Sequence, residues 1–393
     1  MVVTELEGYR ERCTGCFACF NVCPKDAIKM LLDDEGFFYP HIDNKRCVEC
    51  GRCVDVCSIK HMKRIYEKNE ESEVISVQAD DAIREKSSSG GIFYYFAKSV
   101  LDRGGIVYGA AYDKDSKLVC HTSTDQTKLE QIMRSKYVQS NIKNTFREVR
   151  ANLQKGREVL FCGTPCQVRG LYNYLNKDWD NLLTIDFVCH GVPSSGFFKD
   201  MVEAHERDEE SLIEDITFRE KDKGWRTQVI KFYYENNKVL TNASNYYYYY
   251  YLFLHNISLR RSCYVCPNPE NHCADITVWD DWNIEGDDNK GTSAILLNTQ
   301  KAANRYSKIK NHFLEIRTQK IGQYKSAFIN HDRVKSYQRC LPDRERFFVY
   351  YKKYGYDKTL KKWYPAYFKR SVLTTKIRVQ GGRIKAMLKR GKN

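Results

Sequence analysis

Short apolar runs alternate with longer stretches of helical character between residues 80 and 330. Residues 106–113 (IVYGAAYD), 158–161 (EVLF) and 183–188 (LTIDFV) have the length and apolar content of buried strands. The stretch at 87–105 (SSSGGIFYYFAKSVLDRGG) predicts a loop that opens into a helix. Strands that alternate with helices predict an α/β domain, and ligand-binding loops are expected to follow its strands.

Two further elements are predicted downstream. Residues 231–240 (KFYYENNKVL) predict a polar pair of hairpin strands, and residues 246–259 predict a helix. That helix begins with six consecutive tyrosines, 246–251, which would face all directions. Only some of them can belong to a core, so the others are expected to line a cavity or a partner surface, and we assign them no catalytic role.

The distribution of cysteine and charge predicts the domain organisation. The first 62 residues are dense in Cys, Gly and Pro, whereas the following segment is cysteine-free and charged, with EKNEESE at 67–73. We therefore predict an α+β cysteine-rich module at 1–62, a linker at 63–79, the larger α/β domain at 80–330 and a basic, helical extension at 331–393.

The chain has 16 cysteines in 393 residues, and its first residues, MVVTELEGYRER, carry charges throughout. No apolar leader is visible there, so we expect a reducing, cytoplasmic compartment in which thiolates bind metal instead of forming disulfides. No run of 18 apolar residues occurs. The sequence therefore predicts a soluble protein without a transmembrane segment.

The net charge of +14 is concentrated at the end of the chain. Residues 361–393 hold eleven Lys and Arg and no Asp or Glu, and without these eleven charges only +3 remains. A basic end without a recognition module does not predict nucleic-acid binding. We favour a solvated terminal helix, because Gly381 and Gly382 interrupt an amphipathic stripe, and peripheral contact with an anionic membrane is the alternative.

Two cysteine motifs carry the most specific chemistry. CxxCxxCxxxC occurs twice, first followed by Pro24 and then by Ser58 in the position of that proline. This spacing is typical of a ferredoxin with two 4Fe-4S clusters, in which the fourth cysteine of each motif binds the other cluster. Zinc is the alternative, but zinc sites rarely repeat three cysteines at two-residue spacing. The predicted first set is Cys13, Cys16, Cys19 and Cys57, and the second set is Cys47, Cys50, Cys53 and Cys23.

Eight cysteines remain, and four of them are candidates for a third cluster. Cys166 and Cys189 each follow a predicted strand, and Cys263 and Cys266 form a CxxC pair. From spacing alone, a third 4Fe-4S set of these four is as well supported as buried thiols beside a zinc or an empty CxxC pair. Two of the remaining cysteines are alternative ligands of the third cluster, and we interpret the last two as buried or incidental thiols. The alternative ligands are Cys162 and Cys273, and the incidental thiols are Cys120 and Cys340.

Most of the chain resembles the beta subunit family of coenzyme F420 hydrogenases and dehydrogenases. Besides the cysteine-rich module, the resemblance rests on the order of eight motifs. These are SSSGG (87–91), RSKYVQS (134–140), GTPCQ (163–167), CHGVPS (189–194), FREKDKGW (218–225), SCYVC (262–266), DITVWDDW (275–282) and KGTS (290–293). The resemblance implies an FAD-binding domain with its own 4Fe-4S cluster, which exchanges electrons with a two-electron carrier.

The resemblance also implies where FAD binds. Hydroxyls and backbone N–H groups at the start of a helix suit phosphate, two basic side chains suit the pyrophosphate, and Tyr137 suits stacking on a ring. The alternatives are a simple helix cap and solvated charges. The predicted cofactor residues are Ser87, Ser88, Ser89, Gly90, Gly91, Arg134, Lys136, Tyr137, Gly163 and Thr164.

Three positions depart from the family pattern. His272 fills a position that is arginine in relatives, Cys273 follows it, and Asn283 replaces a usual glycine. The first two lie beside the predicted third set, so either Cys273 or Cys162 is an alternative to Cys166. We interpret His190 as a structural histidine. No Ser-His-Asp set, Walker loop or HExxH motif occurs.

The leading functional hypothesis is an anaerobic, cytoplasmic iron–sulfur flavoprotein oxidoreductase. It would pass electrons between FAD and 4Fe-4S clusters, with coenzyme F420, ferredoxin or another carrier or redox protein as its partner. The rival is a non-catalytic ferredoxin-type subunit that serves a partner enzyme, and a third hypothesis is a role in surface polysaccharide assembly. The residues do not predict the substrate, the direction of electron flow or the oligomeric state.

Overall fold

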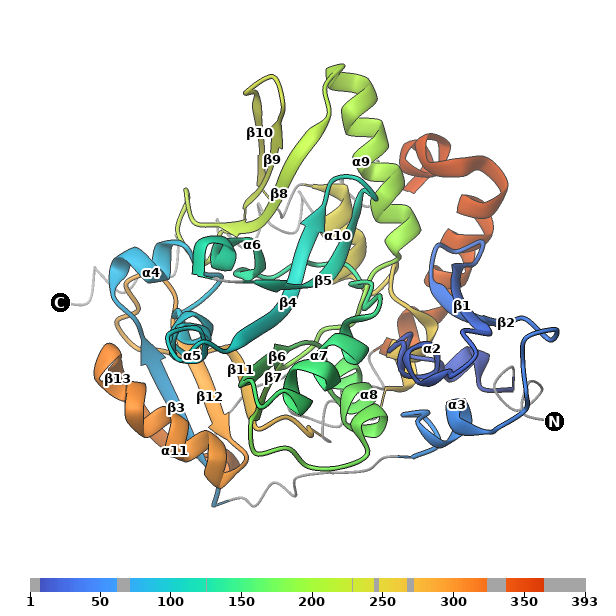
Figure 1. The fold of residues 1–393 in the computed structure, drawn as a ribbon. Helices are drawn as coiled ribbons and strands as arrows, with labels where there is room; N and C mark the ends of the chain where they lie inside the picture. The colour runs from blue at the N-terminus through green and yellow to red at the C-terminus, as the bar shows by residue number, and fades with distance from the viewer. Residues whose placement is uncertain are drawn as a thin grey trace, which may run out of the picture.

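The structure, a computed structural model, describes seven stretches of the chain, which include all sixteen cysteines (Figure 1). In these stretches, no helix is both long enough and apolar enough to cross a membrane, and the cysteines form no disulfide. The structure describes the predicted basic extension at 331–393 only at 337–363, and the rest of it lies outside these stretches. The described residues are 8–61, 71–124, 126–227, 229–243, 247–266, 272–323 and 337–363.

The cysteine-rich module has the predicted α+β character. Its antiparallel strands β1 and β2 pair Ile28 with Ile42 and Leu32 with Phe38. A short helix follows the first cysteines of each motif. The N-cap residue of each helix has a left-handed conformation, as at Gly51, where φ is +76°. The elements are η1 (Arg10–Arg12), α2 (Ala18–Val22), β1 (Ile28–Leu32), β2 (Phe38–Ile42) and α3 (Arg52–Asp55).

The larger domain is built on an eight-stranded sheet in the order β13-β3-β12-β11-β7-β6-β4-β5. The strands β4, β6, β7 and β11 are parallel, and the remaining pairs are antiparallel. The predicted α/β domain is confirmed in this mixed form. The strands are β3 (Glu73–Gln78), β4 (Ile106–Asp113), β5 (Leu118–Thr124), β6 (Val159–Cys162), β7 (Leu182–Phe187), β11 (Ile276–Asp280), β12 (Ser293–Leu297) and β13 (Leu314–Lys320).

One strand of this sheet lies where the sequence predicts a linker. β3 occupies 73–78 within the predicted linker at 63–79, and it pairs with both β12 and β13. Its buried residues Val74 and Val77 belong to the core of the larger domain. The charged residues at 67–73, the last of which begins this strand, made the segment resemble a linker in its local composition.

Helices cover both faces of the sheet (Figure 1). Leu160 points to the face covered by α5 and α11, whereas its neighbours Val159 and Phe161 point to the face covered by α7 and α8. This alternation follows from the two-residue period of a strand. The helical elements here are α4 (Asp81–Glu85), α5 (Ile92–Leu101), η2 (Gln126–Lys128), α6 (Leu129–Ile132), α7 (Thr145–Gln154), α8 (Pro165–Leu175), α11 (Gln300–Ile309), η5 (Lys310–His312) and η6 (Ile321–Gln323).

A second aromatic core lies beside the sheet. Residues 337–363 are helical and pack with α9 and a three-stranded sheet, β10-β9-β8. The predicted hairpin is confirmed as β9 and β10, and the predicted helix at 246–259 is the shorter α10. The elements are α9 (Ser195–Glu209), β8 (Ile213–Glu220), β9 (Val229–Tyr234), β10 (Val239–Ala243), α10 (Tyr248–Leu254) and η4 (Arg261–Val265).

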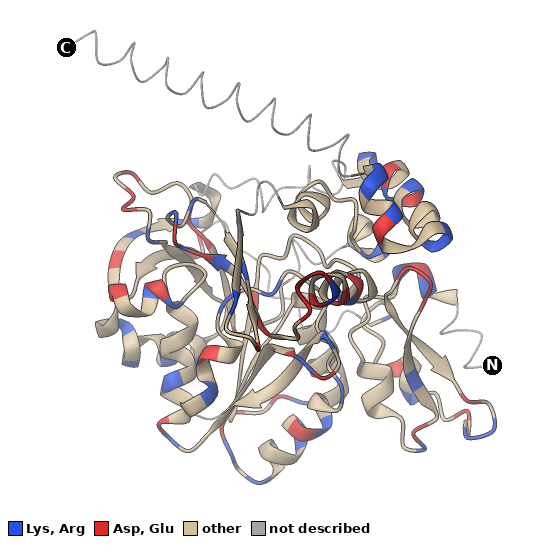
Figure 2. Ribbon diagram, turned by 90° about the horizontal axis from the view of Figure 1, so that it is seen from above, with Lys and Arg blue, Asp and Glu red and all other residues tan. Residues whose placement is uncertain are grey.

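The cysteine-rich module packs directly on the larger domain, on the face covered by α7 and α8. Phe17, Ala18 and Phe38 share a core with residues of both helices. Arg147 of α7 donates to the carbonyl groups of Phe20, Asn21 and Cys23. Figure 2 shows Lys and Arg interspersed with Asp and Glu over both parts. The two parts therefore share an apolar interface, to which Arg147 adds hydrogen bonds.

Candidate functional site

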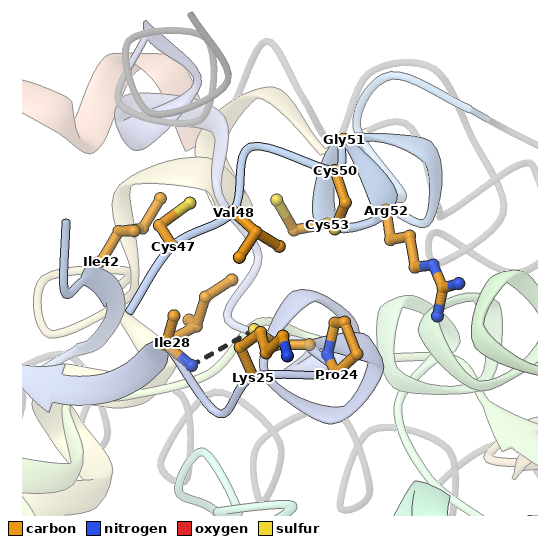
Figure 3. A pocket seen from close by; sticks show the side chains of 12 residues that line it. Pro24, Lys25, Ile28, Ile42, Cys47, Val48, Cys50, Gly51, Arg52 and Cys53 are labelled. Carbon is orange, nitrogen blue, oxygen red and sulfur yellow. Dashed lines mark hydrogen bonds between the residues drawn. The ribbon is translucent and has the colours of Figure 1, made fainter. Parts of the chain in front are cut away.

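The second cysteine set lines one cavity at an exposed end of the module. Cys23 lines this cavity together with Cys47, Cys50 and Cys53, and the last three are labelled in Figure 3. The backbone N–H of Ala27 donates to the sulfur of Cys23 at 3.3 Å, as expected beside a thiolate ligand. These are the four residues that the motif assigns to one cluster. That they bind a 4Fe-4S cluster is a prediction that the spacing and this arrangement support.

The first set lies deeper, against the larger domain. Burial raises the pKa of Cys19 well above its usual value, and the neighbouring thiols of Cys16, Cys13 and Cys57 raise it further. Burial also raises the pKa of Cys57 to about 11, with Cys16 as the next cause. The four thiols are therefore mutual neighbours. Closely spaced thiols in a buried environment stay protonated unless a metal ion replaces their protons.

Ser58, the residue in the position of the second proline, has a contact that the sequence did not predict. It is buried, and its hydroxyl lies 3.7 Å from the sulfur of Cys16 in the other motif. A proline here would lack this polar group. Serine in place of proline at position 58 therefore adds a hydrogen-bonding hydroxyl beside the first set.

The third set is brought together from three loops. Cys166, Cys189, Cys263 and Cys266 line one cavity. Burial raises the pKa of the Cys263 thiol to about 12, and the thiols of Cys266 and Cys189 add to this effect. Within the described residues, no three His, Cys, Asp or Glu side chains stand close enough to hold a single metal ion. A cubane of four irons and four sulfides keeps its thiolates farther apart than one ion does.

Local structure explains how Cys166 reaches this cavity. α8 begins directly after β6, and Thr164 is its N-cap in a capping box with Gln167. The Thr164 hydroxyl also lies 3.1 Å from the Cys166 sulfur. Because Pro165 and Cys166 occupy the first turn, the thiol is held near the positive end of the helix dipole, which favours a thiolate.

His272 and Thr14 also line this cavity, and the sequence did not predict that they would. The ring of His272 is buried, its Nδ1 lies 2.9 Å from Asp186, and its Nε2 has no hydrogen-bond partner. An unpartnered polar atom beside four thiols fits a further hydrogen-bonding group in this cavity. Thr14 belongs to the first cysteine loop, so this loop forms part of the wall of the third set's cavity. The noted departure at His272 was the only sequence indication.

The structure places the alternative cysteines outside the cavity lining that it describes. Cys162 ends β6 and lies near Lys136 and Asp186, and burial raises the pKa of its thiol to about 12. Cys273 is fully buried, and its sulfur lies 3.9 Å from the carbonyl oxygen of Pro165. Cys120 is buried in β5, and Cys340 packs beside Tyr264. The geometry therefore favours Cys166 as the fourth member of the third set.

The predicted phosphate-binding loop, 87–91, lies at the N-terminus of α5. Gly91 is the N-cap with φ of +88°, and no side chain caps this helix. A Cβ atom on Gly90 would collide with the backbone nitrogen of Ser293 and the carbonyl oxygen of Val77. The glycines are thus required by close backbone packing, and the helix terminus is left open to an anion.

Two side chains of the FREKDKGW motif hold this loop in place. The ammonium group of Lys221 donates to the carbonyl oxygens of Ser89, at 3.0 Å, and Lys290, at 2.7 Å. The indole N–H of Trp225 donates to the carbonyl oxygen of Ser88 at 3.0 Å, and its ring stacks on Trp282 with centroids 4.0 Å apart. Four of the motifs that carry the family resemblance, SSSGG, FREKDKGW, DITVWDDW and KGTS, are therefore in contact here.

The segment 134–137 meets the same loop, because the backbone N–H of Ser135 donates to the hydroxyl of Ser88 at 2.7 Å. Arg134 is ion-paired with Glu220, and Lys136 donates to the carbonyl oxygens of Gln131 and Met133. The ring of Tyr137 packs against Phe218, Tyr250 and Phe253. Protein groups therefore engage all three side chains, and their contact with a flavin stays a prediction.

Gly163 and Thr164 join the other predicted cofactor residues at one edge of the sheet. They follow β6, and the adjacent Cys162 lies close enough to Lys136 for each to affect the pKa of the other. Ligands of open α/β sheets bind at this carboxyl edge of parallel strands. His190 lies nearby, with Nε2 at 3.2 Å from the carbonyl oxygen of Phe253, in agreement with a structural role.

Comparison with known families assigns both parts of the chain. Residues 156–321 match the family model for the C terminus of the coenzyme F420 hydrogenase/dehydrogenase beta subunit. Residues 12–60 match a 4Fe-4S dicluster domain. All twelve predicted metal ligands lie in these two ranges, the third cysteine set in the first range and the eight N-terminal cysteines in the second.

Individual relatives match over the short cysteine-rich part. Ferredoxin-type protein NapH of Escherichia coli (strain K12) is 37% identical over 59 residues, which is 14% of this chain and 20% of NapH. The protein of the same name in Haemophilus influenzae is 36% identical over 55 residues, which is 14% of this chain and 19% of that protein. The chain thus spans about a fifth of the length of these relatives.

A solved chain of the F420-reducing [NiFe] hydrogenase complex from Methanosarcina barkeri is also similar, with 17% identity and a TM-score of 0.46. The match covers 72% of this chain and 96% of that chain.

Proposed function

Because the chain belongs to the coenzyme F420 hydrogenase/dehydrogenase beta subunit family and carries a 4Fe-4S dicluster domain, we propose that it is an iron–sulfur flavoprotein oxidoreductase. It passes electrons between FAD at the carboxyl edge of the large sheet and three 4Fe-4S clusters. F420 or another two-electron carrier exchanges electrons with the flavin. A redox protein or small carrier exchanges them with the clusters.

One observation carries this proposal: the third cysteine set lines a cavity whose wall includes Thr14 of the first cysteine loop. A separate electron-transfer module would have no reason to contact a four-thiol cavity in the other domain. Four thiols that line one cavity are also a donor set that fits a 4Fe-4S cluster. The arrangement therefore supports a chain of adjacent redox sites instead of two isolated ones.

A second observation supports flavin at the neighbouring loop. The segment RSKYVQS reaches from the predicted flavin residue Lys136 to Gln139, whose side-chain amide donates to the carbonyl oxygen of Thr14 at 2.8 Å. Three residues of extended chain span at most about 11 Å. The predicted flavin site and the first cysteine loop are therefore joined by one short, buried segment.

The residues present fit these groups and have definite tasks. Bound FAD supplies the exchange between two-electron and one-electron chemistry. The open N-terminus of α5 would receive phosphate oxygens, while Lys221 and Trp225 hold the loop in the required form. Asp186 accepts a hydrogen bond from Nδ1 of His272 and so fixes the orientation of the ring that lines the third site.

Metal and flavin analysis tests the proposal. The full chain is reconstituted with iron, sulfide and FAD under anoxic conditions, and its contents are measured. We expect about twelve iron atoms and about one FAD per chain. Eight irons without flavin would contradict the proposal and would favour a subunit that only relays electrons.

The partner is tested separately. Reduced F420, NAD(P)H and reduced ferredoxin are offered anaerobically to the loaded protein, and the flavin absorbance is followed. The proposal predicts that a two-electron carrier bleaches the flavin before the clusters are reduced. A flavin that none of these carriers reduces or reoxidises would show that the family's reaction is absent from this chain.

A further inference from the structure

Arg260 is a fully buried guanidinium between two candidate cluster sites. Its Nε donates to the carbonyl oxygen of Cys13 at 2.6 Å, one terminal nitrogen donates to Gln139 Oε1 at 2.9 Å, and the other donates to the carbonyl oxygen of Phe38 at 2.9 Å. Its side chain also lies over the ring of Tyr39, 4.2 Å from the centroid. All three acceptors are neutral, although arginine keeps its charge in a protein.

Four other arginines of the described residues are buried, Arg169 among them, and ion pairs with carboxylates are seen for the remaining three. Arg84 is paired with Asp288, Arg219 with Asp280, and Arg344 with Glu35. Arg260, with no exposed surface, has no carboxylate within ion-pair distance in the part of the chain that the structure describes. An unpaired buried charge costs several kcal/mol, so a further anionic group is expected beside it.

The two cysteine sites adjoin Arg260 and are candidate sources of negative charge. Arg260 bonds directly to the backbone of Cys13 in the first set, and the backbone N–H of Cys263 in the third set donates to the carbonyl oxygen of Arg260 at 2.9 Å. Four thiolates around a 4Fe-4S core give each loaded site a net negative charge. The guanidinium of Arg260 therefore lies beside the first set, and the backbone of the same residue is bonded to the third set.

Close packing keeps the two sites adjacent. A Cβ atom on Gly170 would lie 2.9 Å from Cβ of Cys16, so α8 touches the first set at this glycine. Cys166 of the third set lies four residues earlier on the same helix face, about 6 Å along the axis. A Cβ atom on Gly15 would similarly lie 2.9 Å from the guanidinium of Arg260.

We propose that Arg260 is the shared counter-charge of the first and third cluster sites. This inference rests on the proposed function, because it requires a cluster at the third site. A fixed positive charge stabilises the added electron at a nearby site and so raises its reduction potential. Arg260 therefore raises the potentials of the first and third sites relative to the second, whose Cys50 is exposed.

The shared position also suits transfer between the two sites. When one electron leaves the third site and enters the first, one site is oxidised and the other is reduced, and their summed charge does not change. A counter-charge that adjoins both sites then stabilises the states before and after transfer. In this scheme an electron from the larger domain reaches the first site of the cysteine-rich module before it reaches the second site.

Redox titration followed by electron paramagnetic resonance tests the inference on the reconstituted full chain. Arg260→Gln is expected to lower the potentials of the first and third sites and to leave that of the second unchanged. Arg260→Lys keeps the charge, so it is expected to retain most of both potentials. A merely structural role would make the two variants alike. The third-site spectrum is identified by its loss in Cys263→Ser.

Arg147→Gln is the matched control. Arg147 also donates to carbonyl groups of a cysteine loop, but it is part-exposed and paired with Asp26. Its replacement is expected to leave the first and third potentials unchanged. If Arg260→Gln fails to load iron, Gln139→Glu neutralises the retained Arg260 and is expected to lower the same two potentials.

The two proposals fail differently. This inference alone would be overturned if the wild type binds twelve irons but the first and third potentials are unchanged in Arg260→Gln. If Arg260→Gln does not load iron, unchanged potentials in Gln139→Glu would have the same meaning. An equal shift of all three sites would overturn it as well. Eight irons in the wild type would overturn the proposed function together with the inference.

Discussion

At the scale of single residues, buried polar groups at the junction of the two parts have specific partners. His121 is 4% exposed, and its Nε2 lies 3.0 Å from the carbonyl oxygen of Cys162. Since a carbonyl only accepts, Nε2 carries the proton and Nδ1 accepts from Ser140 at 2.9 Å. The neutral ring is thus fully satisfied, and burial lowers the pKa of His121 to about 4.

This lowered pKa predicts a loss of stability in acid. The unfolded chain binds a proton at His121 near pH 6.5, whereas the folded chain binds it only near pH 4, so stability falls as the pH drops through this window. Between pH 7 and pH 5, His121 is expected to remove about 2 kcal/mol of unfolding free energy. Urea unfolding under anoxic conditions measures this in the wild type and in His121→Gln. The same acid loss in both proteins would contradict the assignment.

Gly170 supplies a second prediction at this scale. Alanine stabilises a helix by about 1 kcal/mol over glycine, but here its Cβ would lie 3.0 Å from the sulfur of Cys16. Overpacking of this kind costs about 1–3 kcal/mol. Gly170→Ala is therefore expected to lose iron from the first site faster under a chelator. Gly8→Ala, where the added carbon meets no atom within 4 Å, is the control, and equal rates of iron loss would refute the contact.

Contacts between residues far apart in the chain are the part of the site that the sequence does not predict. The spacing of the eight N-terminal cysteines predicts which thiols become neighbours, because a local loop geometry follows from two intervening residues. Arg260 and His272 had no comparable pattern. Their neighbours lie up to 247 residues away in the chain, so only the fold shows what surrounds them.

At the scale of elements, α8 links the sheet, the third set and the cysteine-rich module. Its N-terminal turn carries Cys166, and its buried Gln167 bonds both Thr164 and Ser140. The GTPCQ motif is visible in the sequence, but its residues do not reveal that the glutamine is part of the cap. The helix is therefore positioned by hydrogen bonds at the end where the predicted ligand lies.

Replacing Gln167 is expected to destabilise this element. Gln167→Leu removes the capping interaction and the two hydrogen bonds from the buried Gln167 amide to Ser140, at a cost of about 2–3 kcal/mol in unfolding free energy. Gln300→Leu, an exposed glutamine on α11 that bonds Asn304, should cost less than about 0.5 kcal/mol. Urea unfolding of both variants measures the difference. Equal costs would show that the cap does not position α8.

The order of strands was not predictable at this scale. Alternating strands and helices predict parallel neighbours, and β4, β6, β7 and β11 follow this rule. β3 pairs antiparallel with β12 and β13, and it lies in a segment whose preceding charges suggested a linker. Long-range pairing of this kind depends on which apolar faces remain uncovered, and local composition does not contain that information.

At the scale of the whole molecule, three cysteine sets lie in sequence from the exposed end of the module to the interior of the larger domain. The second set contains the exposed Cys50, the first lies against α8, and the third shares a wall with the first loop. The predicted flavin loop meets the same region through residues 134–140. The architecture is thus a linear arrangement of candidate redox sites across a domain interface.

The central claim is that the third set holds a cluster of its own, and iron counting in paired cysteine variants tests it most directly. Cys263→Ser is expected to lower the iron content of the reconstituted full chain from about twelve to about eight per chain. Cys273→Ser, a buried thiol outside the cavity lining, is the control and should keep about twelve. Unchanged iron in Cys263→Ser, or an equal loss in Cys273→Ser, would contradict the account.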